Sequence, residues 1–70
     1  MPRCMKGMPQ NRVSVFRTRA QVTQEVLAEA VDVSRQTIIA IERGNYTPSV
    51  FLALKLGRFF KCKVDDLFFL

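Results

Sequence analysis

Apolar side chains recur at helical spacing in several stretches of the chain, and short polar runs with Gly or Pro separate these stretches. The two clearest stretches follow one another in the middle of the chain, and a hydroxyl residue stands directly before each, Thr23 and Ser34. A hydroxyl side chain at this position can accept a hydrogen bond from a backbone N–H that the first helical turn leaves unpaired. The pattern therefore predicts helices over 24–31 and 35–43.

Only Asp32 and Val33 stand between these two predicted helices, so the connection must be a tight turn. Helices joined so tightly cross at a steep angle and bury their inner faces against each other. Ala28 is small enough to allow such a close crossing. The residues that we expect on the inner faces are Leu27, Ala28, Val31, Val33, Ile38 and Ile41.

Weaker apolar patterns predict further helices on both sides of this pair. Asn11 can cap a first helix over 11–20, and Ser49 can cap a fourth helix over 50–60. A last short helix is expected over 64–68. The inward stripe of the fourth helix is expected to consist of Val50, Ala53, Leu54 and Phe60, with Lys55 and Arg58 facing solvent. Since no stretch predicts a strand, the expected fold class is all-α, a compact bundle of five helices.

The length of the chain, 70 residues, is enough for one domain. Residues 1–10 hold three Met, two Pro and one Gly without any apolar period, so they predict a flexible tail before a domain over 11–70. Arg3 and Lys6 leave a second interpretation open, in which this tail is a basic arm that touches DNA. Met5 and Met8 are further candidates for the first residue.

The composition narrows the classes of function. The chain carries 11 Lys and Arg against 6 Asp and Glu, and the resulting net charge of +5 suits a polyanionic partner. With no His and only Cys4 and Cys62, it offers no disulfide framework, zinc site or nucleophile–base pair. No apolar run reaches the ~20 residues that span a bilayer. We expect a cytoplasmic protein that is not an enzyme and needs no metal, cofactor or small-molecule ligand.

Several short groups of residues occur at fixed spacing through the middle of the chain: Thr23-Gln24, Leu27-Ala28, Val33-Ser34-Arg35-Gln36-Thr37-Ile38, Ile41-Glu42-Arg43-Gly44 and Pro48-Ser49. Together they resemble the helix-turn-helix of the Cro/phage-repressor (Xre-type) family of bacterial, archaeal and phage DNA-binding proteins. The resemblance runs from about Asn11 to Phe68. It implies a five-helix phage-repressor-like domain, with helices two and three as the helix-turn-helix. It also implies a transcriptional repressor that binds a palindromic operator in double-stranded DNA as a homodimer. Such a protein is expected to be of prokaryotic or phage origin and to be associated with the nucleoid.

The resemblance implies that the helix 35–43 enters the major groove of B-DNA, which admits one α-helix. Gln36 can then bind adenine N6 and N7, and Arg35 can bind guanine O6 and N7 or a phosphate. Ile39 is expected to face outward toward a thymine methyl group, because Ile38 and Ile41 already fill the inward positions; the alternative is that Ile39 is a buried core residue. The full set of expected DNA-binding residues is Thr23, Gln24, Ser34, Arg35, Gln36, Thr37, Ile39, Ala40, Arg43, Asn45 and Thr47.

Two structural expectations also come from the resemblance. The family pairs an Arg at the position of Arg17 with the Glu at the position of Glu42, so we expect a structural ion pair between the first and third helices. The family favours Gly at the positions of Gln21, Asp32 and Lys61, where this chain departs from it. Gly suits a left-handed helix end, so the departures at Gln21 and Asp32 are expected to cost stability, and the cap at Lys61 is non-standard.

Apolar residues replace the family's usual charges at Val15, Val26 and Phe51, and the chain reaches Leu70 through two consecutive Phe residues. Exposed apolar patches commonly mark interfaces. We therefore expect a homodimer interface formed by Phe51, Phe68, Phe69 and Leu70. The alternative is that Phe68 and Leu70 fold back into the core.

Two other functions compete with a regulator that acts alone. The chain could be the antitoxin of a toxin–antitoxin pair, with its apolar patch on the toxin. It could instead be a protein-interaction domain that has lost DNA binding. The presence of Gln24, Arg35, Gln36 and Arg43 in a basic chain argues against this second alternative.

Overall fold

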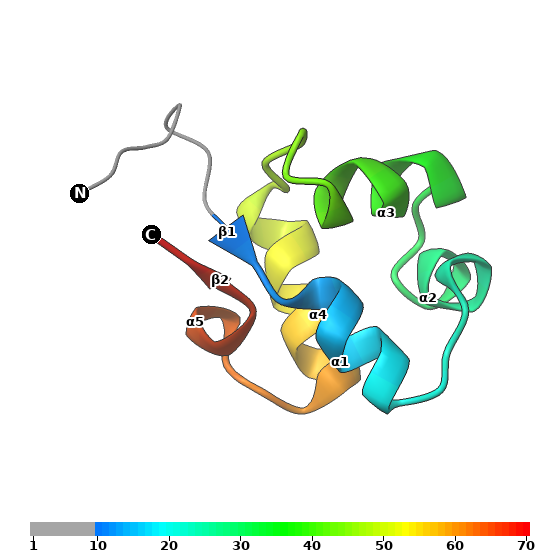
Figure 1. The fold of residues 1–70 in the computed structure, drawn as a ribbon, viewed down its shortest axis with the longest axis horizontal. Helices are drawn as coiled ribbons and strands as arrows, with labels where there is room; N and C mark the ends of the chain where they lie inside the picture. Colours follow the sequence, from blue (N-terminus) through cyan, green and yellow to red (C-terminus); the bar gives the residue numbers. More distant parts are fainter. Residues whose placement is uncertain (1–9) are drawn as a thin grey trace.

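Five helices and one pair of short strands form the protein in the computed structural model, which describes residues 10–70 (Figure 1). In chain order the elements are β1 (Gln10–Asn11), α1 (Val13–Arg19), α2 (Gln24–Ala30), α3 (Arg35–Glu42), α4 (Val50–Phe60), α5 (Val64–Leu67) and β2 (Phe68–Phe69). In Figure 1, α3 lies along the upper edge with α2 at one end of the molecule, and the strands and α5 lie at the other end. Residues 1–9, most of the predicted tail, lie outside the described residues.

The caps predicted from the hydroxyl residues are confirmed. Thr23 Oγ1 accepts a hydrogen bond of 3.1 Å from the backbone N–H of Val26 at the start of α2. Ser34 Oγ accepts one of 3.2 Å from Thr37 at the start of α3, and Ser49 caps α4 in the same way. These bonds satisfy donors that would otherwise be unpaired, and each such cap typically stabilises a helix by about 1 kcal/mol.

The predicted interior of the helix pair is also confirmed. The fully buried side chains include Leu27 and Val31 of the α2 region and Ile38 and Ile41 of α3, with Ala28 almost as deep. They pack with Val13, Leu52, Leu56 and Leu67 into one core, and Val33 lies partly buried against it. The apolar faces of α2 and α3 thus anchor the pair to the other helices.

The predicted inward stripe of α4 is correct only in part: Ala53 is buried and Phe60 is partly buried against the core, but Val50 and Leu54 face solvent. Val50 and Leu54 are 76% and 56% exposed, whereas Leu52, Ala53, Leu56 and Gly57 are buried. Residues 50–60 are apolar almost all round the helix, so spacing alone could not choose the buried face. The buried face includes Gly57, where an added Cβ would lie 3.0 Å from the backbone oxygen of Cys62. A side chain at this position would require the neighbouring backbone to move by a few tenths of an ångström.

Each of the helices α1 to α4 is followed by a residue whose backbone lies in the left-handed region. Gln21, Asp32 and Lys61 have φ of 59°, 63° and 57°, and Gly44 has φ of 79°. An L-residue in this conformation crowds its Cβ against the backbone, at a cost of roughly 1–2 kcal/mol, which Gly avoids. The three positions where the family favours Gly therefore do have left-handed backbone. In this chain they are occupied by Gln21, Asp32 and Lys61, which this conformation disfavours.

The strand pair is a feature that the sequence did not predict. β1 and β2 run antiparallel, with Gln10 opposite Phe69 and Asn11 opposite Phe68. The next residue, Arg12, donates its backbone N–H to Leu67 O at 2.8 Å, and its guanidinium lies 4.2 Å from the centre of the Phe69 ring. Gln10, which was assigned to the tail, therefore belongs to the folded domain, and the two ends of that domain are held together.

Five helix bounds shift by one or two residues from the prediction, and two of them are the end of α1 at Arg19 and the end of α2 at Ala30. α1 begins at Val13 because Asn11 lies in β1, although Asn11 Oδ1 still accepts a hydrogen bond of 3.1 Å from the N–H of Val13. α3 ends at Glu42, with Arg43 as its cap, and α5 ends at Leu67, where β2 begins. Asn11 also donates its amide to Ile41 O at 2.8 Å, so it joins the N-terminal strand to the end of α3.

Candidate DNA-binding surface

The first turn of α3 carries its polar side chains into solvent. Ile38 and Ile41 bury the inner side of the helix, whereas Ser34, Arg35 and Gln36 are exposed. Within residues 10–70, no hydrogen bond or ion pair holds the side chain of Arg35 or Gln36. These two side chains can therefore meet a partner without first breaking contacts inside the described part of the protein.

The neighbouring hydroxyl groups are engaged with each other. Ser34 Oγ and Thr37 Oγ1 lie 3.0 Å apart, and Ser34 Oγ also accepts the cap bond from the Thr37 backbone. Ile39 and Ala40 are half-buried, so the expectation that Ile39 faces fully outward is met only in part. The outer side of α3 is thus polar at its beginning and partly apolar in its middle.

The segment after α3 extends this surface. Gly44 follows α3 with a positive φ, and the backbone N–H of Asn45 donates a hydrogen bond of 2.9 Å to Ala40 O. The side chains of Arg43, Asn45 and Thr47 are all exposed beyond this turn. The three residues predicted to hold flanking phosphates are therefore on one loop that begins at the end of α3.

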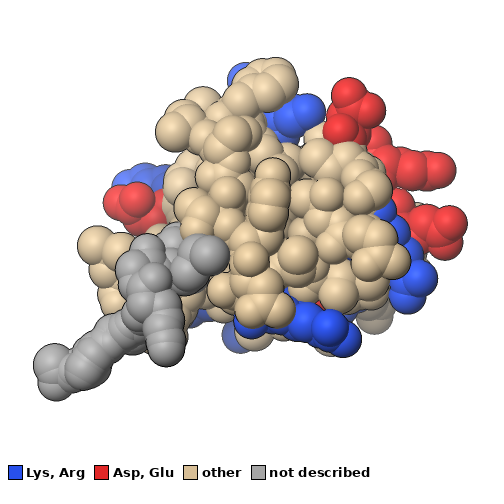
Figure 2. Space-filling view, turned by 90° about the horizontal axis from the view of Figure 1, so that it is seen from above, with Lys and Arg blue, Asp and Glu red and all other residues tan. Residues whose placement is uncertain are grey.

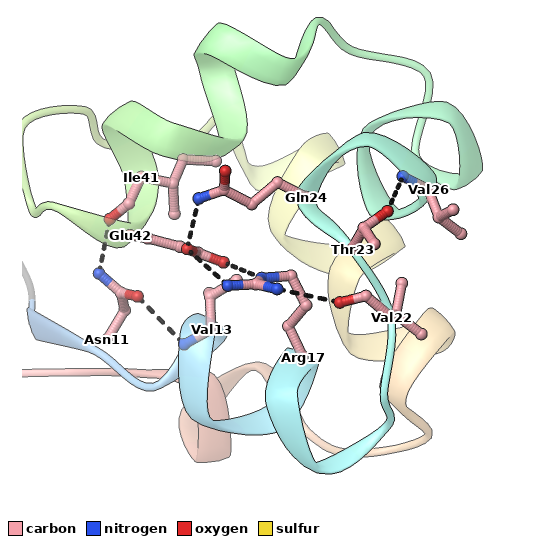
Figure 3. A network of polar contacts seen from close by, with 9 residues as sticks. All are labelled: Asn11, Val13, Arg17, Val22, Thr23, Gln24, Val26, Ile41 and Glu42. Carbon is pink, nitrogen blue, oxygen red and sulfur yellow. Dashed lines mark hydrogen bonds and ion pairs between the residues drawn. The ribbon is translucent and has the colours of Figure 1, made fainter.

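Arg17 and Glu42 form the expected ion pair between α1 and α3. Arg17 Nε donates to Glu42 Oε2 at 2.7 Å, and the two side chains are 19% and 8% exposed (Figure 3). Arg17 Nη1 also donates to Val22 O at 2.9 Å, in the link that leads into α2. Removing one partner of a fully buried pair typically costs about 3–5 kcal/mol, because the other charge is left uncompensated, and this partly exposed pair is expected to cost less.

Gln24, the first residue of α2, also donates a hydrogen bond to the Glu42 carboxylate. Its Nε2 atom donates to Glu42 Oε1 at 3.0 Å, so Figure 3 shows the Arg17 and Gln24 side chains converging on Glu42 from two helices. The sequence did not indicate this link, since 18 positions separate the two residues and no pattern connects them. The first residue of α2 and the last residue of α3 are held to each other by a side-chain hydrogen bond.

The charged side chains are unevenly placed on the face that bears α3 (Figure 2). Most of this view is uncharged, and Lys and Arg atoms appear around its edge. A small acidic group lies at one end, while most Asp and Glu atoms gather at the other end. That end is where α2 lies, and α2 with the turn after it carries Glu25, Glu29 and Asp32, all exposed. A polyanion that lies along α3 would thus have its least favourable contacts at the α2 end.

The four residues predicted for a dimer interface divide between two places. Phe51 is 69% exposed and lines a hollow with Ala30, Leu54 and Phe59, with Lys55 Nζ 4.6 Å from the centre of its ring. At the strand end, Phe68 packs against the core, Phe69 lies under the Arg12 guanidinium, and Leu70 is fully exposed. The alternative in which the C-terminal residues fold back thus holds for Phe68 but not for Leu70.

Other kinds of site find little support in the described part of the chain. Residues 10–70 contain no cluster of His, Cys, Asp and Glu that could hold a metal ion. None of the helices described is long and apolar enough to cross a membrane. The exposed polar groups on α3 and its loop remain the clearest candidate for a functional surface.

Comparison with known proteins agrees with this geometry. A family model described as helix-turn-helix matches residues 16–67, from α1 to the end of α5. The chain belongs to the Cro/phage-repressor (Xre-type) helix-turn-helix family. It is accordingly a DNA-binding transcriptional regulator, and α2 and α3 are its helix-turn-helix.

Relatives of this regulator occur in archaea and bacteria. The chain is 50% identical over 58 residues to MJ0272 of Methanocaldococcus jannaschii, named an uncharacterized HTH-type transcriptional regulator, covering 83% of this chain and 88% of that protein. It is 48% identical over 60 residues to YgzD of Bacillus subtilis, which bears the same description, covering 86% and 91%. The crystal structure of the restriction-modification controller protein C.AhdI from Aeromonas hydrophila superposes with a TM-score of 0.73 at 27% identity, covering 79% of this chain and 83% of that chain.

Proposed function

We propose that this regulator is a sequence-specific repressor that binds double-stranded DNA by placing α3 in the major groove. The observation that carries the proposal is the exposed and unengaged pair Arg35 and Gln36 at the beginning of α3. The rest of that helix is held by the buried Ile38 and Ile41 and by the ion pair of Glu42. A rigid helix with free polar side chains in its first turn suits the reading of base edges.

The chemistry of each side chain suggests its contact. The amide of Gln36 matches the adjacent acceptor and donor of adenine, and the guanidinium of Arg35 matches the two acceptors of guanine or a phosphate. Half-buried Ile39 and Ala40 can lie against a thymine methyl group. We place phosphate contacts, which fix register without reading sequence, at Thr23, Gln24, Ser34, Thr37, Arg43, Asn45 and Thr47.

We further propose that the regulator acts as a homodimer on a palindromic operator in the cytoplasm. Exposed Phe51, with Val50 and Leu54 beside it on α4, forms the larger apolar surface, and Leu70 with Phe69 forms a second one. Burying such surface against a second copy is favourable by roughly 25 cal/mol per Å² of apolar area. A small domain bound across a promoter would block the polymerase, and for this reason we propose repression.

The dimer proposal is tested by sedimentation equilibrium at micromolar concentration. The wild-type chain should sediment as a dimer, and Phe51→Lys should shift it to a monomer. Leu70→Lys tests the second apolar surface separately, and Thr18→Lys at an exposed position of α1 adds the same single charge as a control. Wild-type protein that is monomeric throughout would rule out the homodimer.

The DNA-binding proposal is tested by selecting bound duplexes from a random pool with the wild-type chain, Gln36→Ala and Arg43→Ala. The wild type should enrich a palindrome whose half-sites lie about one helical turn apart. Gln36→Ala should relax the preference at one position per half-site. Arg43→Ala, the matched control on the same surface, should weaken binding to all duplexes alike and lower the salt slope by about 1. A pool that yields no enriched sequence would refute the proposal.

A further inference from the structure

Three positive side chains gather where α4 ends and the chain passes to α5. A shallow hollow lies in the surface there, and its lining residues are Gly57, Arg58, Lys61, Cys62, Lys63 and Asp66. Arg58, Lys61 and Lys63, which we call the α4–α5 cluster, are all exposed. Within residues 10–70, none of these three side chains forms an ion pair. Their positive charges are therefore open to a partner.

Two of these cations occupy positions that their own backbone disfavours. Lys61 has left-handed backbone with φ of 57°, which costs an L-residue roughly 1–2 kcal/mol. Lys63 stands directly before α5, where Ser, Thr, Asp or Asn would accept a capping hydrogen bond that an ammonium group cannot accept. Of the three, Arg58 alone is favoured by the helix dipole, in the last turn of α4. Local structure therefore does not explain the positive charge at Lys61 and Lys63.

The α4–α5 cluster lies on the side of the protein opposite α3. In Figure 1 the link between α4 and α5 runs along the lower edge of the molecule, whereas α3 lies along the upper edge. On α3 and the loop after it, the exposed cations are Arg35 and Arg43. A duplex that lies against α3 thus leaves the three cations of the cluster uncovered.

The lining of this hollow suits phosphate groups better than a protein surface. Within residues 10–70 it holds no large apolar side chain, whereas the buried centre of a protein interface is usually apolar. Its carboxylate, that of Asp66, already accepts a hydrogen bond of 3.1 Å from the backbone N–H of Lys63. Exposed Lys and Arg side chains bind the backbone of DNA by releasing its condensed counter-ions.

We propose that the α4–α5 cluster holds the phosphate backbone of a second DNA duplex while α3 is bound to the operator, so that the regulator bridges two segments of DNA. The proposal rests on the proposed function, because binding at an operator brings neighbouring duplex close to the cluster. The contacts are made to phosphates, so the second duplex is held without regard to its sequence. This role accounts for Lys at two positions that the backbone disfavours.

The test asks whether protein that is already bound to its operator retains a second duplex. The operator selected by the wild type is immobilised and saturated with protein, and a short fluorescent duplex without the operator sequence is added at several salt concentrations. Lys61→Gly removes one exposed positive charge inside the cluster, and Arg19→Gln removes one outside it. The double variant Lys61→Gly with Lys63→Ser removes two. Gly and Ser suit these backbone positions, so thermal unfolding should show the double variant at least as stable as the wild type.

The expected loss is confined to the second duplex. At low salt the double variant should retain it about tenfold less than the wild type, and the salt slope should fall by about 2. Lys61→Gly alone should lose more than Arg19→Gln, and every variant should bind the operator within about twofold of the wild type. A double variant that retains the second duplex as well as Arg19→Gln does would overturn the proposal.

The acidic residue of the hollow gives a test that depends on a gain. Asp66→Asn keeps an oxygen that can accept from the N–H of Lys63 and removes the negative charge. It should strengthen retention of the second duplex relative to Asp65→Asn, which neutralises an exposed carboxylate of α5 outside the lining. Equal retention by these two variants would contradict a phosphate site in this hollow.

Polyglutamate as a competitor distinguishes DNA from an acidic protein segment. Displacement of the second duplex only above the concentration at which unlabelled duplex displaces it, counted in charges, supports the proposal. Displacement at or below that concentration would assign the cluster to an acidic protein instead. A wild-type chain that selects no operator refutes the proposed function. A complex that binds its operator but retains no second duplex overturns the bridging role alone, so the two failures are distinguishable.

Discussion

Lys61→Gly is expected to stabilise the protein. Lys61 ends α4 with φ of 57° and ψ of 45°, in the left-handed region. The N–H groups of Lys61 and Cys62 close the helix on Arg58 O and Gly57 O at 3.2 and 2.9 Å, so the conformation is held by the helix end itself. The Lys61 side chain is exposed, and its removal leaves no cavity.

The size of the effect follows from two opposing terms. Relief of the left-handed backbone gains roughly 1–2 kcal/mol. Gly also has more conformational freedom in the unfolded chain, which lowers the free energy of unfolding by about 0.4–1 kcal/mol. The net gain therefore lies between about 0 and 1.6 kcal/mol, and its central value of about 0.8 kcal/mol corresponds to a rise in Tm of about 3–6 °C for a domain of this size.

Thermal unfolding followed by circular dichroism measures this gain at one fixed protein concentration, because dimerisation would make Tm depend on concentration. Lys61→Ala is the matched control, since it removes the same side chain but keeps a Cβ. Ala20→Gly is the opposite control, because Ala20 has φ of −80° and gains nothing from Gly. The reasoning fails if Lys61→Gly melts no higher than Lys61→Ala.

Two further predictions concern the segment around α5. Gly57→Ala should destabilise the protein by about 1–3 kcal/mol in urea unfolding, because its Cβ would meet the Cys62 backbone oxygen at 3.0 Å; an unchanged midpoint would contradict this packing. Burial, and then the nearby Asp66 carboxylate, raises the pKa of the Cys62 thiol. In a Cys4→Ser chain at neutral pH, Cys62 should therefore react with iodoacetamide more slowly than in the unfolded chain, and faster as the pH rises. Asp66→Asn should speed the reaction more than the control Asp65→Asn, and equal rates would exclude the charge effect.

The helix-turn-helix could be predicted from the sequence because several signals agree there. The hydroxyl residues Thr23 and Ser34 mark both helix starts, and apolar residues occupy one side of each helix only. The short turn between the helices leaves few ways to pack them. Local capping and periodicity therefore determine this unit, and the exposure of Arg35 and Gln36 follows from the burial of Ile38.

The features that the sequence missed depend on tertiary contacts. On α4 both sides are apolar, so the period does not identify the buried face, which packs through Leu52 and Leu56 against the core. The strands are two residues long and join opposite ends of the domain, which is too short for an alternating pattern. The hydrogen bond between Gln24 and Glu42 likewise joins residues that no local rule connects.

The first turn of α3 is the part of the protein that we propose contacts the bases of DNA. The most direct measurement is a titration of the ¹⁵N-labelled chain with its selected duplex, followed by the chemical shifts of the backbone amides. We predict the largest changes at residues 34–40, with smaller ones at 43–47 and near Gln24. Changes confined to Phe51 and its neighbours on α4, or to residues 68–70, would contradict the claim.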